Sequence, residues 1–333
     1  MPDLSRRQLL AGTAATATVI ATAGIALQPV RAQQPDLAGK SILITGCSSG
    51  FGHEGALHYA RRGAKVFATM RNTPRPEGAE LARIAAEEEL DLHVIDIDVL
   101  SDESVAAGVA EAETIAGGGL DVLVNNAGIG TGLTAELQDM EATRLMFDTN
   151  VFGYQRMARA VLPAMRARGS GQIFAVSSQL GRVVVPSYGL YCATKFAVEA
   201  HAEQLAYELV PHGIEVTIIQ PGGYPTEIWR NSNRYTEALL ARASEERKAA
   251  YPNFVENALQ TGAGRDTDVL DIPRAIAEII AMPPGTRPLR RAIHPTSIPQ
   301  EAINRVSAET QVAWLGQSGY GPWIRAVHNQ PAA

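Results

Sequence analysis

Short runs of β-branched residues alternate with longer amphipathic stretches along most of this chain, and this alternation constrains the fold most strongly. It is typical of βαβ units, in which helices join parallel strands. The gaps between the runs are long enough for right-handed crossovers. We therefore predict a single doubly wound α/β domain with a parallel sheet, without linker or internal repeat. The expected strands are residues 41–45, 65–69, 92–96, 121–125, 172–177 and 215–220.

The predicted helices lie between these strands, where apolar residues recur at helical spacing. They span residues 52–62, 77–89, 101–116, 136–168 and 191–210. Residues 228–254 read as a polar helical insertion, placed where a doubly wound sheet needs a cover for its ligand crevice. A short strand is expected at 289–294, after a Pro-Pro-Gly break. We take 37–295 as one nucleotide-binding domain and 296–333 as a C-terminal extension.

A glycine-rich loop directly follows the first expected strand, with the sequence Thr45-Gly46-Cys47-Ser48-Ser49-Gly50-Phe51-Gly52. Glycines at these offsets permit a tight turn, let the backbone approach a pyrophosphate and bring the next helix close to the strand. The N-terminus of that helix can then hold the anion. A glycine triplet alone is a weak signal, but this position between a first strand and a first helix supports dinucleotide binding. We expect cofactor contacts from Gly46, Ser48, Ser49, Gly50, Phe51 and Gly52.

The spacing T-G-x-x-x-G-x-G resembles that of the classical short-chain dehydrogenase/reductase family, and four further motifs follow in that family's order. They are Asp98-Val99, Asn125-Asn126-Ala127-Gly128, Ser178 with Tyr191-Cys192-Ala193-Thr194-Lys195, and Pro221-Gly222-Gly223-Tyr224-Pro225-Thr226. The resemblance covers roughly residues 38–295. It implies a Rossmann-type fold and nicotinamide-dependent oxidoreduction of an alcohol or carbonyl compound. It also places beside the cofactor Asp98, Val99, Asn126, Ala127, Gly128, Tyr191, Lys195, Pro221, Gly222 and Thr226.

The residue at the end of the second strand bears on the choice of nicotinamide cofactor. A carboxylate there would accept hydrogen bonds from the adenine-ribose hydroxyls and repel a 2′-phosphate. Met70 occupies this position, and the Arg71 guanidinium that follows can grip a phosphate. Ser49 in the glycine loop offers a second donor. We therefore expect NADP(H) to be preferred over NAD(H).

Tyr191 and Lys195 are the candidate acid/base pair, because hydride transfer at a carbinol or carbonyl carbon needs a group that handles the oxygen's proton. They stand at i and i+4 on one expected helix, so both project from the same face. Lowering the tyrosine pKa by roughly three units needs about 4 kcal/mol, and we expect the lysine ammonium to supply it. By resemblance, Ser178 hydrogen-bonds the substrate oxygen, Asn150 supports a proton-relay water, and Lys195 also contacts the nicotinamide ribose.

The residues at 45–52 and 65–71 look most like the hydroxysteroid and retinol dehydrogenase branch, which implies a hydrophobic alcohol or ketone. Two alternatives stay open: a catalytically silent NADP-binding regulator, and an epimerase or dehydratase that uses the same tyrosine and lysine. The intact set of Asn150, Ser178, Tyr191 and Lys195 weighs against the regulator, and the glycine spacing weighs against the epimerase. The helices at 136–168 and 191–210 resemble those through which family members dimerise, so a homodimer or homotetramer is expected.

Charge and the N-terminus bear on partners and location. A net charge of −6 without lysine- and arginine-rich runs argues against nucleic acid as the main partner. No metal site is expected. Residues 1–32 have a charged start, an apolar stretch and a small-residue cleavage site, as in a secretory signal peptide. Ser5-Arg6-Arg7-Gln8-Leu9-Leu10 resembles the twin-arginine (Tat) consensus, which implies binding to the Tat export machinery and a periplasmic location, with the cytoplasm as the alternative.

Overall fold

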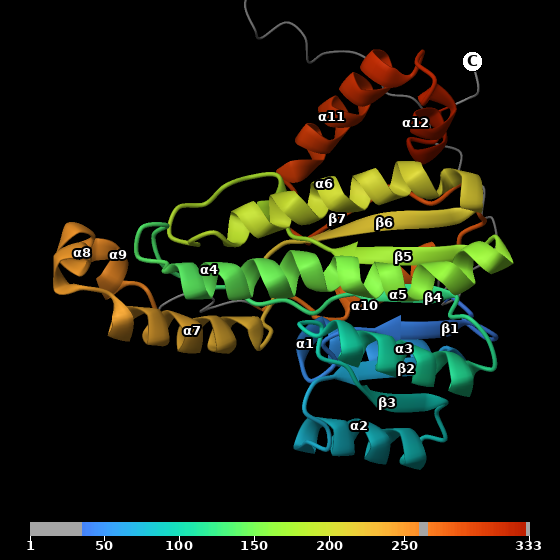
Figure 1. Cartoon of the computed structure of the whole chain (residues 1–333), viewed down its shortest axis with the longest axis horizontal. Helices are drawn as coiled ribbons and strands as arrows, with labels where there is room; N and C mark the ends of the chain where they lie inside the picture. The colour runs from blue at the N-terminus through green and yellow to red at the C-terminus, as the bar shows by residue number, and fades with distance from the viewer. Residues whose placement is uncertain (1–34, 260–265, 331–333) are drawn as a thin grey trace, which may run out of the picture. The chain divides into compact units, whose positions relative to one another are not determined.

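A computed structural model describes residues 35–259 and 266–330 of the chain (Figure 1). The predicted signal peptide, residues 1–32, lies outside the described residues. Parallel pairing joins the strands into one seven-stranded sheet with the order β3-β2-β1-β4-β5-β6-β7. The strands are β1 (Ser41–Ile44), β2 (Lys65–Met70), β3 (Leu92–Asp96), β4 (Val122–Asn125), β5 (Gly171–Val176), β6 (Ile214–Pro221) and β7 (Arg290–Ile293).

The strand order reverses between β1 and β4, which lie side by side at the centre of the sheet. In open α/β sheets a ligand binds outside the carboxyl ends of the strands at such a switch point. The predicted parallel sheet is confirmed, and every predicted strand, the short seventh included, is found within one residue at each end. The runs of β-branched residues were therefore a sufficient signal for the framework.

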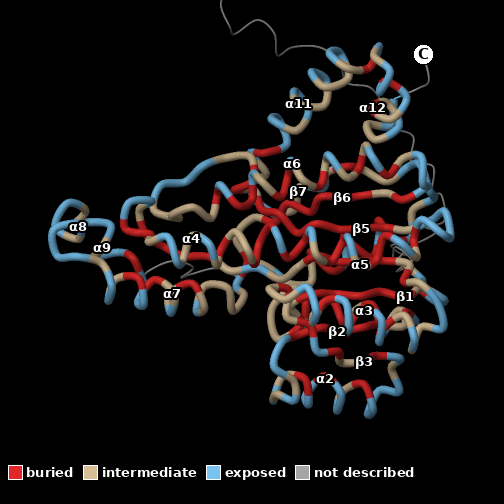
Figure 2. The backbone as a smooth tube through the Cα atoms, viewed as in Figure 1, coloured by how far each residue is buried: buried red, intermediate tan, exposed pale blue. Residues whose placement is uncertain are grey.

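Helices cover both faces of the sheet, so its strands are apolar on both sides. One face packs against α3 (Asp102–Ala116), α5 (Gly153–Arg168) and α6 (Tyr191–Leu209), which lie in front of the sheet in Figure 1. The other face packs against α1 (Gly50–Ala60), α2 (Pro76–Glu87) and α10 (Asp271–Ala281). Neighbouring residues of β1 serve opposite faces, since Leu43 belongs to the first core and Ile42 to the second. Figure 2 shows the resulting buried layer along the strands.

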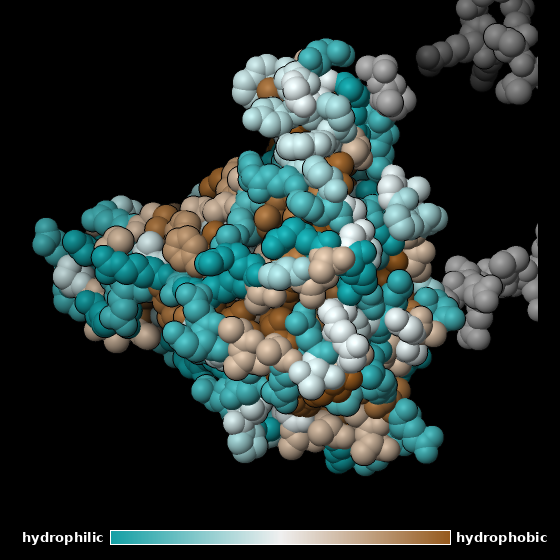
Figure 3. Space-filling model, turned by 45° about the vertical axis from the view of Figure 1, so that its right-hand side comes forward, coloured by the Kyte–Doolittle hydropathy of each residue, from teal (hydrophilic) through white to brown (hydrophobic). Residues whose placement is uncertain are grey.

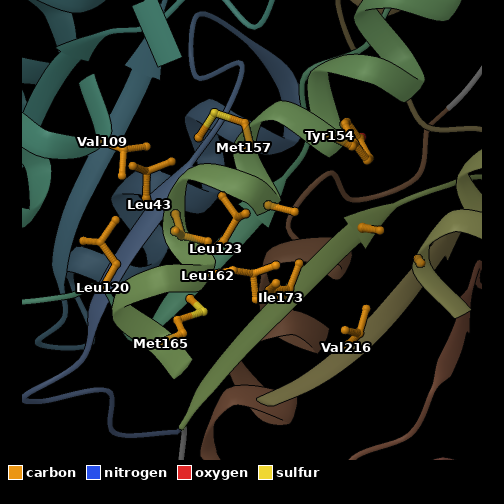
Figure 4. Close-up of a cluster of buried hydrophobic side chains, with 14 of the residues drawn as sticks. Leu43, Val109, Leu120, Leu123, Tyr154, Met157, Leu162, Met165, Ile173 and Val216 are labelled. Atoms are coloured by element: carbon orange, nitrogen blue, oxygen red, sulfur yellow. The ribbon is translucent and has the colours of Figure 1, made fainter. Parts of the chain in front are cut away.

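The first core is built where α5 lies across the centre of the sheet (Figure 4). Leu43, Leu123 and Ile173 from three strands meet Met157 and Met165 from α5, and each of these side chains is at most 1% exposed. Burying a side chain of this size contributes about 1.5–3 kcal/mol. The helices on this face are therefore fixed firmly, and α6 carries the candidate acid/base pair.

The single helix predicted over residues 136–168 is wrong in two respects. Asp139 caps a later start by accepting a hydrogen bond from the Ala142 amide, so α4 spans Met140–Phe147. A π-helical turn, η1 (Asp148–Phe152), then separates α4 from α5. A π-turn holds one residue more than an α-helical turn, and such turns occur frequently at functional sites. This irregularity has no signature in the apolar periodicity.

The insertion after β6 is helical as expected, but it forms three helices instead of one: α7 (Ile228–Arg242), α8 (Glu245–Ala250) and α9 (Pro252–Glu256). Ser244 starts α8 by accepting a hydrogen bond from the Arg247 amide, and Pro252 starts α9. In Figure 1 these helices lie toward the carboxyl ends of the strands. A small core of Leu133, Leu137, Leu239 and Ala258 ties them to the loop after β4.

The C-terminal extension contains two helices that the sequence reading did not predict, α11 (Gln300–Leu315) and α12 (Gly321–Val327). α11 packs on β7 and α12, and α12 packs on α6. Outside this extension, the chain also forms two short 3₁₀ turns, η2 (Gln179–Gly181) and η3 (Val210–His212).

Across the described ranges, no helix has the length and apolar character needed to span a bilayer. On the face drawn in Figure 3, hydrophobic side chains show between hydrophilic ones.

Candidate active site

A cleft of about 690 Å³ opens where the strands end, at the switch point between β1 and β4. Each of the first six strands contributes to its wall at or just after its last residue, through Gly46, Met70, Asp98, Asn126, Ser177 and Pro221. All the predicted site residues line this cleft except Gly52 and Asn150. The structure thus brings together motifs that are spread over 180 positions, from Gly46 to Thr226.

The glycine loop forms a cradle that a single Cβ atom would fill. Gly46 has a φ of +75°, and a Cβ there would lie 2.9 Å from the Ala127 Cα. A Cβ on Gly52 would lie 2.4 Å from the Gly46 carbonyl oxygen. The helix α1 starts within the loop, and its N-cap residue Ser49 makes no side-chain cap. A narrow backbone cradle at a helix N-terminus suits the pyrophosphate of a dinucleotide, so these residues fit the expected cofactor.

Two neighbouring segments brace this loop. The Asn126 amide hydrogen-bonds the Thr45 hydroxyl at 2.9 Å, and the Asn126 side chain donates to the Thr45 carbonyl oxygen at 2.8 Å. On the far side, a Cβ added to Gly50 would meet the Thr226 side chain at 3.2 Å. Thr226 therefore lies against the glycine loop. Asn126 lines the cleft and also fixes the loop's position.

The last residue of β2 is not a carboxylate, and the residues that follow it place two arginines at the rim of the cleft. Met70 is 3% exposed, and Arg71 follows on the exposed rim of the cleft. Arg75 and Glu77 also line this rim and form an ion pair of 2.8 Å. The Arg75 guanidinium lowers the pKa of the Glu77 carboxyl. Sequence reasoning missed Arg75 and Glu77, although an arginine four residues after Arg71 was the available signal.

Tyr191 is the first residue of α6, and Lys195 follows one turn later on the same face. The Lys195 Nζ lies 5.7 Å from the centre of the Tyr191 ring. Lys195 is 4% exposed, and its ammonium donates a hydrogen bond of 2.8 Å to the Val176 carbonyl oxygen at the end of β5. The Tyr154 hydroxyl donates to the same oxygen at 3.0 Å. These contacts hold the ammonium at the floor of the cleft.

In the protein without a bound cofactor, burial displaces the pKa values of both Tyr191 and Lys195. Burial raises the pKa of the Tyr191 phenol, and a hydrogen bond with Ser178 acts in the opposite direction. Burial also lowers the pKa of Lys195 to about 8, against the charge of Glu199. Burial is therefore the dominant cause of the raised Tyr191 pKa in the protein alone. The phenol is protonated near neutral pH, the form that donates a proton to a carbonyl oxygen.

Ser178 stands two residues beyond β5, with an extended backbone that turns its side chain toward the cleft. It is 8% exposed, and its hydroxyl oxygen accepts a hydrogen bond of 3.1 Å from the Leu180 amide. The hydroxyl also hydrogen-bonds the Tyr191 phenol. Two oxygen groups that can bind one substrate oxygen are thus adjacent.

Asn150 lies within the π-turn η1 and is completely buried. Its side-chain amide donates to the Ile129 carbonyl oxygen at 2.9 Å and to the Thr194 hydroxyl at 3.0 Å, and its Oδ1 accepts from the Ile129 amide at 2.8 Å. The structure does not bring Asn150 to the cleft wall. It instead places Asn150 behind Ile129, which does line the cleft, and joins that loop to α6.

The remaining wall of the cleft includes a group of apolar and aromatic residues that the sequence did not predict. Its members come from α4, from the loop before α6 and from α7: Leu145, Val185, Tyr188, Ile228, Trp229 and Tyr235. The Tyr188 and Trp229 rings meet edge to face, with centres 6.4 Å apart. The insertion after β6 thus reaches the cleft, as expected of a cover. Aromatic residues at helical spacing usually belong to a core, so these positions carried no specific signal.

Comparison with known proteins gives the same relationship at two levels. The family model described as "short chain dehydrogenase" matches residues 40–237. Retinol dehydrogenase 8 from Bos taurus is 42% identical over 193 residues, which cover 57% of this chain and 61% of that protein. Human 17-beta-hydroxysteroid dehydrogenase type 1 is 38% identical over 215 residues, covering 62% of this chain and 63% of that protein. The match therefore spans about three fifths of the length of these relatives.

Solved structures resemble the chain over a longer span. A short-chain dehydrogenase from Streptomyces avermitilis is 30% identical, with a TM-score of 0.66, and the match covers 82% of this chain and 95% of that one. A gluconate 5-dehydrogenase from Burkholderia cenocepacia, solved with NADP and tartrate, is 28% identical with a TM-score of 0.58, covering 72% of this chain and 88% of that one.

Proposed function

Because the chain belongs to the short chain dehydrogenase family, we propose that it is an NAD(P)-dependent oxidoreductase that transfers a hydride between the cofactor and an alcohol or carbonyl substrate. The observation that carries this proposal is the meeting of Ser178, Tyr191 and Lys195 in the cleft that the glycine loop closes at its other end. A dinucleotide cradle and an acid/base pair in one cleft are the two parts that such a reaction needs.

The side chains divide the proton chemistry between them. A bound nicotinamide supplies the hydride in reduction and accepts it in oxidation. In the reducing direction the Ser178 hydroxyl binds the carbonyl oxygen and the Tyr191 phenol gives that oxygen its proton. The Lys195 ammonium, held by the Val176 carbonyl, stabilises the phenolate that remains. Oxidation reverses these steps, with the phenolate as the base.

The rim at the end of β2 supports a preference for NADP(H) over NAD(H). Arg71 lies on the cleft with no ion pair to a carboxylate among the described residues, and Arg75 stands beside it. A guanidinium binds a 2′-phosphate through paired hydrogen bonds, while Met70 offers no charge that would repel it. The Michaelis constant for NADPH should accordingly be lower than that for NADH.

The apolar wall supports a hydrophobic substrate. Leu145, Val185, Tyr188, Trp229 and Tyr235 line the cleft and offer apolar contacts to a hydrophobic alcohol or ketone. Polar residues of α7, among them Arg230 and Asn231, line the same cleft. Relatives that carry the names retinol dehydrogenase and hydroxysteroid dehydrogenase are consistent with a substrate of this kind.

A substrate screen tests the proposal. Protein lacking residues 1–32 is mixed with NADPH and a panel of ketones and aldehydes from small polar to steroid- and retinoid-like, and the absorbance of NADPH is followed, with NADH as the control. We expect the decay to be fastest with hydrophobic carbonyls. Binding of NADPH without turnover across the panel would instead support a silent cofactor-binding regulator.

A homodimer or homotetramer is part of the same proposal. Phe152 on η1 and Phe196 on α6 are 53% and 41% exposed, which is unusual for two aromatic side chains on neighbouring elements. A second copy of the chain that covers both would remove this apolar area from water. Light scattering of the Phe196→Ser variant should report a smaller mass than that of the wild type.

We also propose export by the Tat machinery, which rests on the sequence of residues 1–32 alone. Fractionation of the native host should recover protein cleaved near residue 32 outside the cytoplasm. Recovery of only uncleaved protein in the cytoplasm would reject export and would leave the proposed reaction unaffected.

A further inference from the structure

Four charged side chains gather behind α6, away from the cleft, and the proposed reaction does not use them. Glu199 and Glu203 lie on α6, Arg290 lies on β7, and Arg182 follows η2. The side chains of Glu199 and Arg290 are 2% and 6% exposed. Charged groups are rarely buried this deeply unless they are paired.

Direct hydrogen bonds fix the carboxylate of Glu199 on both oxygens. The Arg290 Nε donates to Glu199 Oε2 at 2.8 Å, and the Gln220 side-chain amide donates to Glu199 Oε1 at 2.9 Å. The other end of the Arg290 guanidinium donates to Glu203. Arg182 adds a further positive charge to this cluster. Glu199 is therefore an anion held in one position by groups from β6 and β7.

Glu199 lies one helical turn after Lys195, so its charge acts on the catalytic ammonium. The close approach of Gly181 marks the same turn: a Cβ there would lie 2.9 Å from the Glu199 Cγ and 3.1 Å from the Lys195 carbonyl oxygen. The other groups that face Lys195 are uncharged, namely the Tyr154 and Tyr191 rings and the Val176 carbonyl. Among the described residues, Glu199 is the carboxylate whose charge favours protonated Lys195.

On the basis of the proposed function, we propose that Glu199 is a positioning residue for Lys195: its carboxylate keeps the buried ammonium charged, and Arg290 holds that carboxylate in place. A buried lysine loses its proton easily, because burial disfavours the cation. Burial brings the pKa of Lys195 down to about 8, so the remaining margin above neutral pH is small. Without the anion behind it, the lysine loses its charge within the working pH range and the phenolate of Tyr191 loses its counter-ion.

The same cluster connects the C-terminal extension to the catalytic helix. Asn304 on α11 donates a hydrogen bond of 2.6 Å to the Gln220 side chain, which in turn holds Glu199. His328, after α12, lies 2.8 Å from the Tyr207 hydroxyl, and Tyr207 hydrogen-bonds Glu203. The extension thus has a physical role in this proposal, since it completes the support of the Glu199 carboxylate.

The pH dependence of turnover tests the proposal, with Glu199→Gln as the variant. The variant keeps the shape of the side chain and removes its charge, and its amide oxygen can still accept from one of the two donors, Arg290 or Gln220. We expect the alkaline limb of kcat/KM for carbonyl reduction to move to lower pH by about one unit. Glu199→Asp, which keeps the charge, should hold the limb near its wild-type position. Glu208→Gln, an exposed position on the same helix, is the matched control and should not move it.

A merely structural role gives a different result. In that case Glu199→Gln lowers kcat/KM by a similar factor at every pH and leaves the limb where it is. That outcome, or an equal shift of the alkaline limb in Glu208→Gln, would overturn the proposal.

Unfolding of the cofactor-free protein gives a second readout that needs no turnover. The folded pKa of Lys195 is about 8 against 10.5 for a free lysine, so the unfolded state binds more protons between these values and stability rises with pH there. In Glu199→Gln this rise should begin at lower pH than in Glu208→Gln. Identical pH profiles would reject the inference. A wild type without any turnover would reject the proposed function, while the unfolding profiles would still decide the role of Glu199.

Discussion

The two halves of the cleft differ in whether backbone or side-chain atoms form their functional part. On the side of β1, β2 and β3, the central feature is backbone: a glycine loop whose positions 46 and 52 have no room for a Cβ, at the N-terminus of α1. On the side of β4, β5 and β6, the wall presents reactive side chains, with Ser178 and Lys195 both beside Tyr191.

This difference separates a steric problem from an electrostatic one. The glycine loop can bind the cofactor because its glycines have no Cβ atoms. Cofactor binding there depends on close packing and should change little with pH. The Tyr191–Lys195 pair depends on the protonation of two buried groups whose pKa values are displaced by burial. Substitutions on one side should therefore act on cofactor binding, and those on the other side on turnover and its pH dependence.

The largest effect is expected for Tyr191→Phe. Removal of the phenolic proton donor should lower turnover by about 10³-fold, in the middle of the range for the loss of a general acid/base. Phenylalanine keeps the ring that packs against Gly130, so the fold should be unaffected. The measurement is the rate of NADPH oxidation at saturating carbonyl substrate, and a rate close to that of the wild type would reject the acid/base assignment.

Gly52→Ala tests the other half of the cleft. The added Cβ would lie 2.4 Å from the Gly46 carbonyl oxygen and 2.7 Å from the Asn126 Nδ2, so the backbone of the loop must move. We expect NADPH to bind about 100-fold more weakly, which corresponds to the upper end of about 3 kcal/mol for overpacking. Fluorescence titration with NADPH measures the effect. Gly118→Ala is the control, because nothing lies within 4 Å of its Cβ, and equal binding by the two variants would contradict the cradle.

Lys195→Met should reveal the energetic cost of the buried ammonium. Lys195 is charged in both states below pH 8, and its lowered folded pKa then destabilises the native state by about 3 kcal/mol for a displacement from 10.5 to about 8. The variant should therefore be more stable to unfolding than the wild type at pH 6. This difference in the free energy of unfolding should shrink as pH rises from about 8 to 10.5. Urea unfolding at several pH values measures this. A difference independent of pH would show that the lysine is not displaced from its free pKa.

The smallest effect is expected at the rim of the cleft. Arg71→Ala should raise the Michaelis constant for NADPH by about tenfold, since one exposed phosphate contact contributes about 1.4 kcal/mol, and should leave that for NADH nearly unchanged. Arg166→Ala, on the exposed end of α5, is the control. An equal change in the Michaelis constants for both cofactors would mean that Arg71 does not bind the 2′-phosphate.

The framework was predictable from the sequence because its signals are local. Parallel strands covered on both faces are continuous apolar runs, and the glycine loop is recognised by its spacing and its place after β1. The helix α10 carried a local signal too, since Ile272, Ile276 and Ile279 are buried at helical spacing, yet it was overlooked. The π-turn η1 was hidden, because it inserts a residue without disturbing the apolar pattern.

The parts of the site that the sequence did not predict depend on distant partners. Glutamates on a helix are usually solvated, and Glu199 is buried because Arg290, 91 residues later, pairs with it. The hydrogen bonds of the Asn150 side chain to Ile129 and Thr194, 21 and 44 positions away, could not be foreseen from the sequence, and its support of a proton-relay water stays a prediction. The raised pKa of Tyr191 likewise follows from burial in the assembled cleft, which spacing alone does not give.

The most direct test of the division between the two halves is the dissociation constant of NADPH for Tyr191→Phe, measured by fluorescence titration beside the wild type. The account predicts a value within about twofold of the wild type in a variant that no longer turns over, because the cofactor is held by the glycine loop and the rim of β2. A loss of binding in parallel with the loss of turnover would contradict it, since binding and proton transfer would then depend on the same residue.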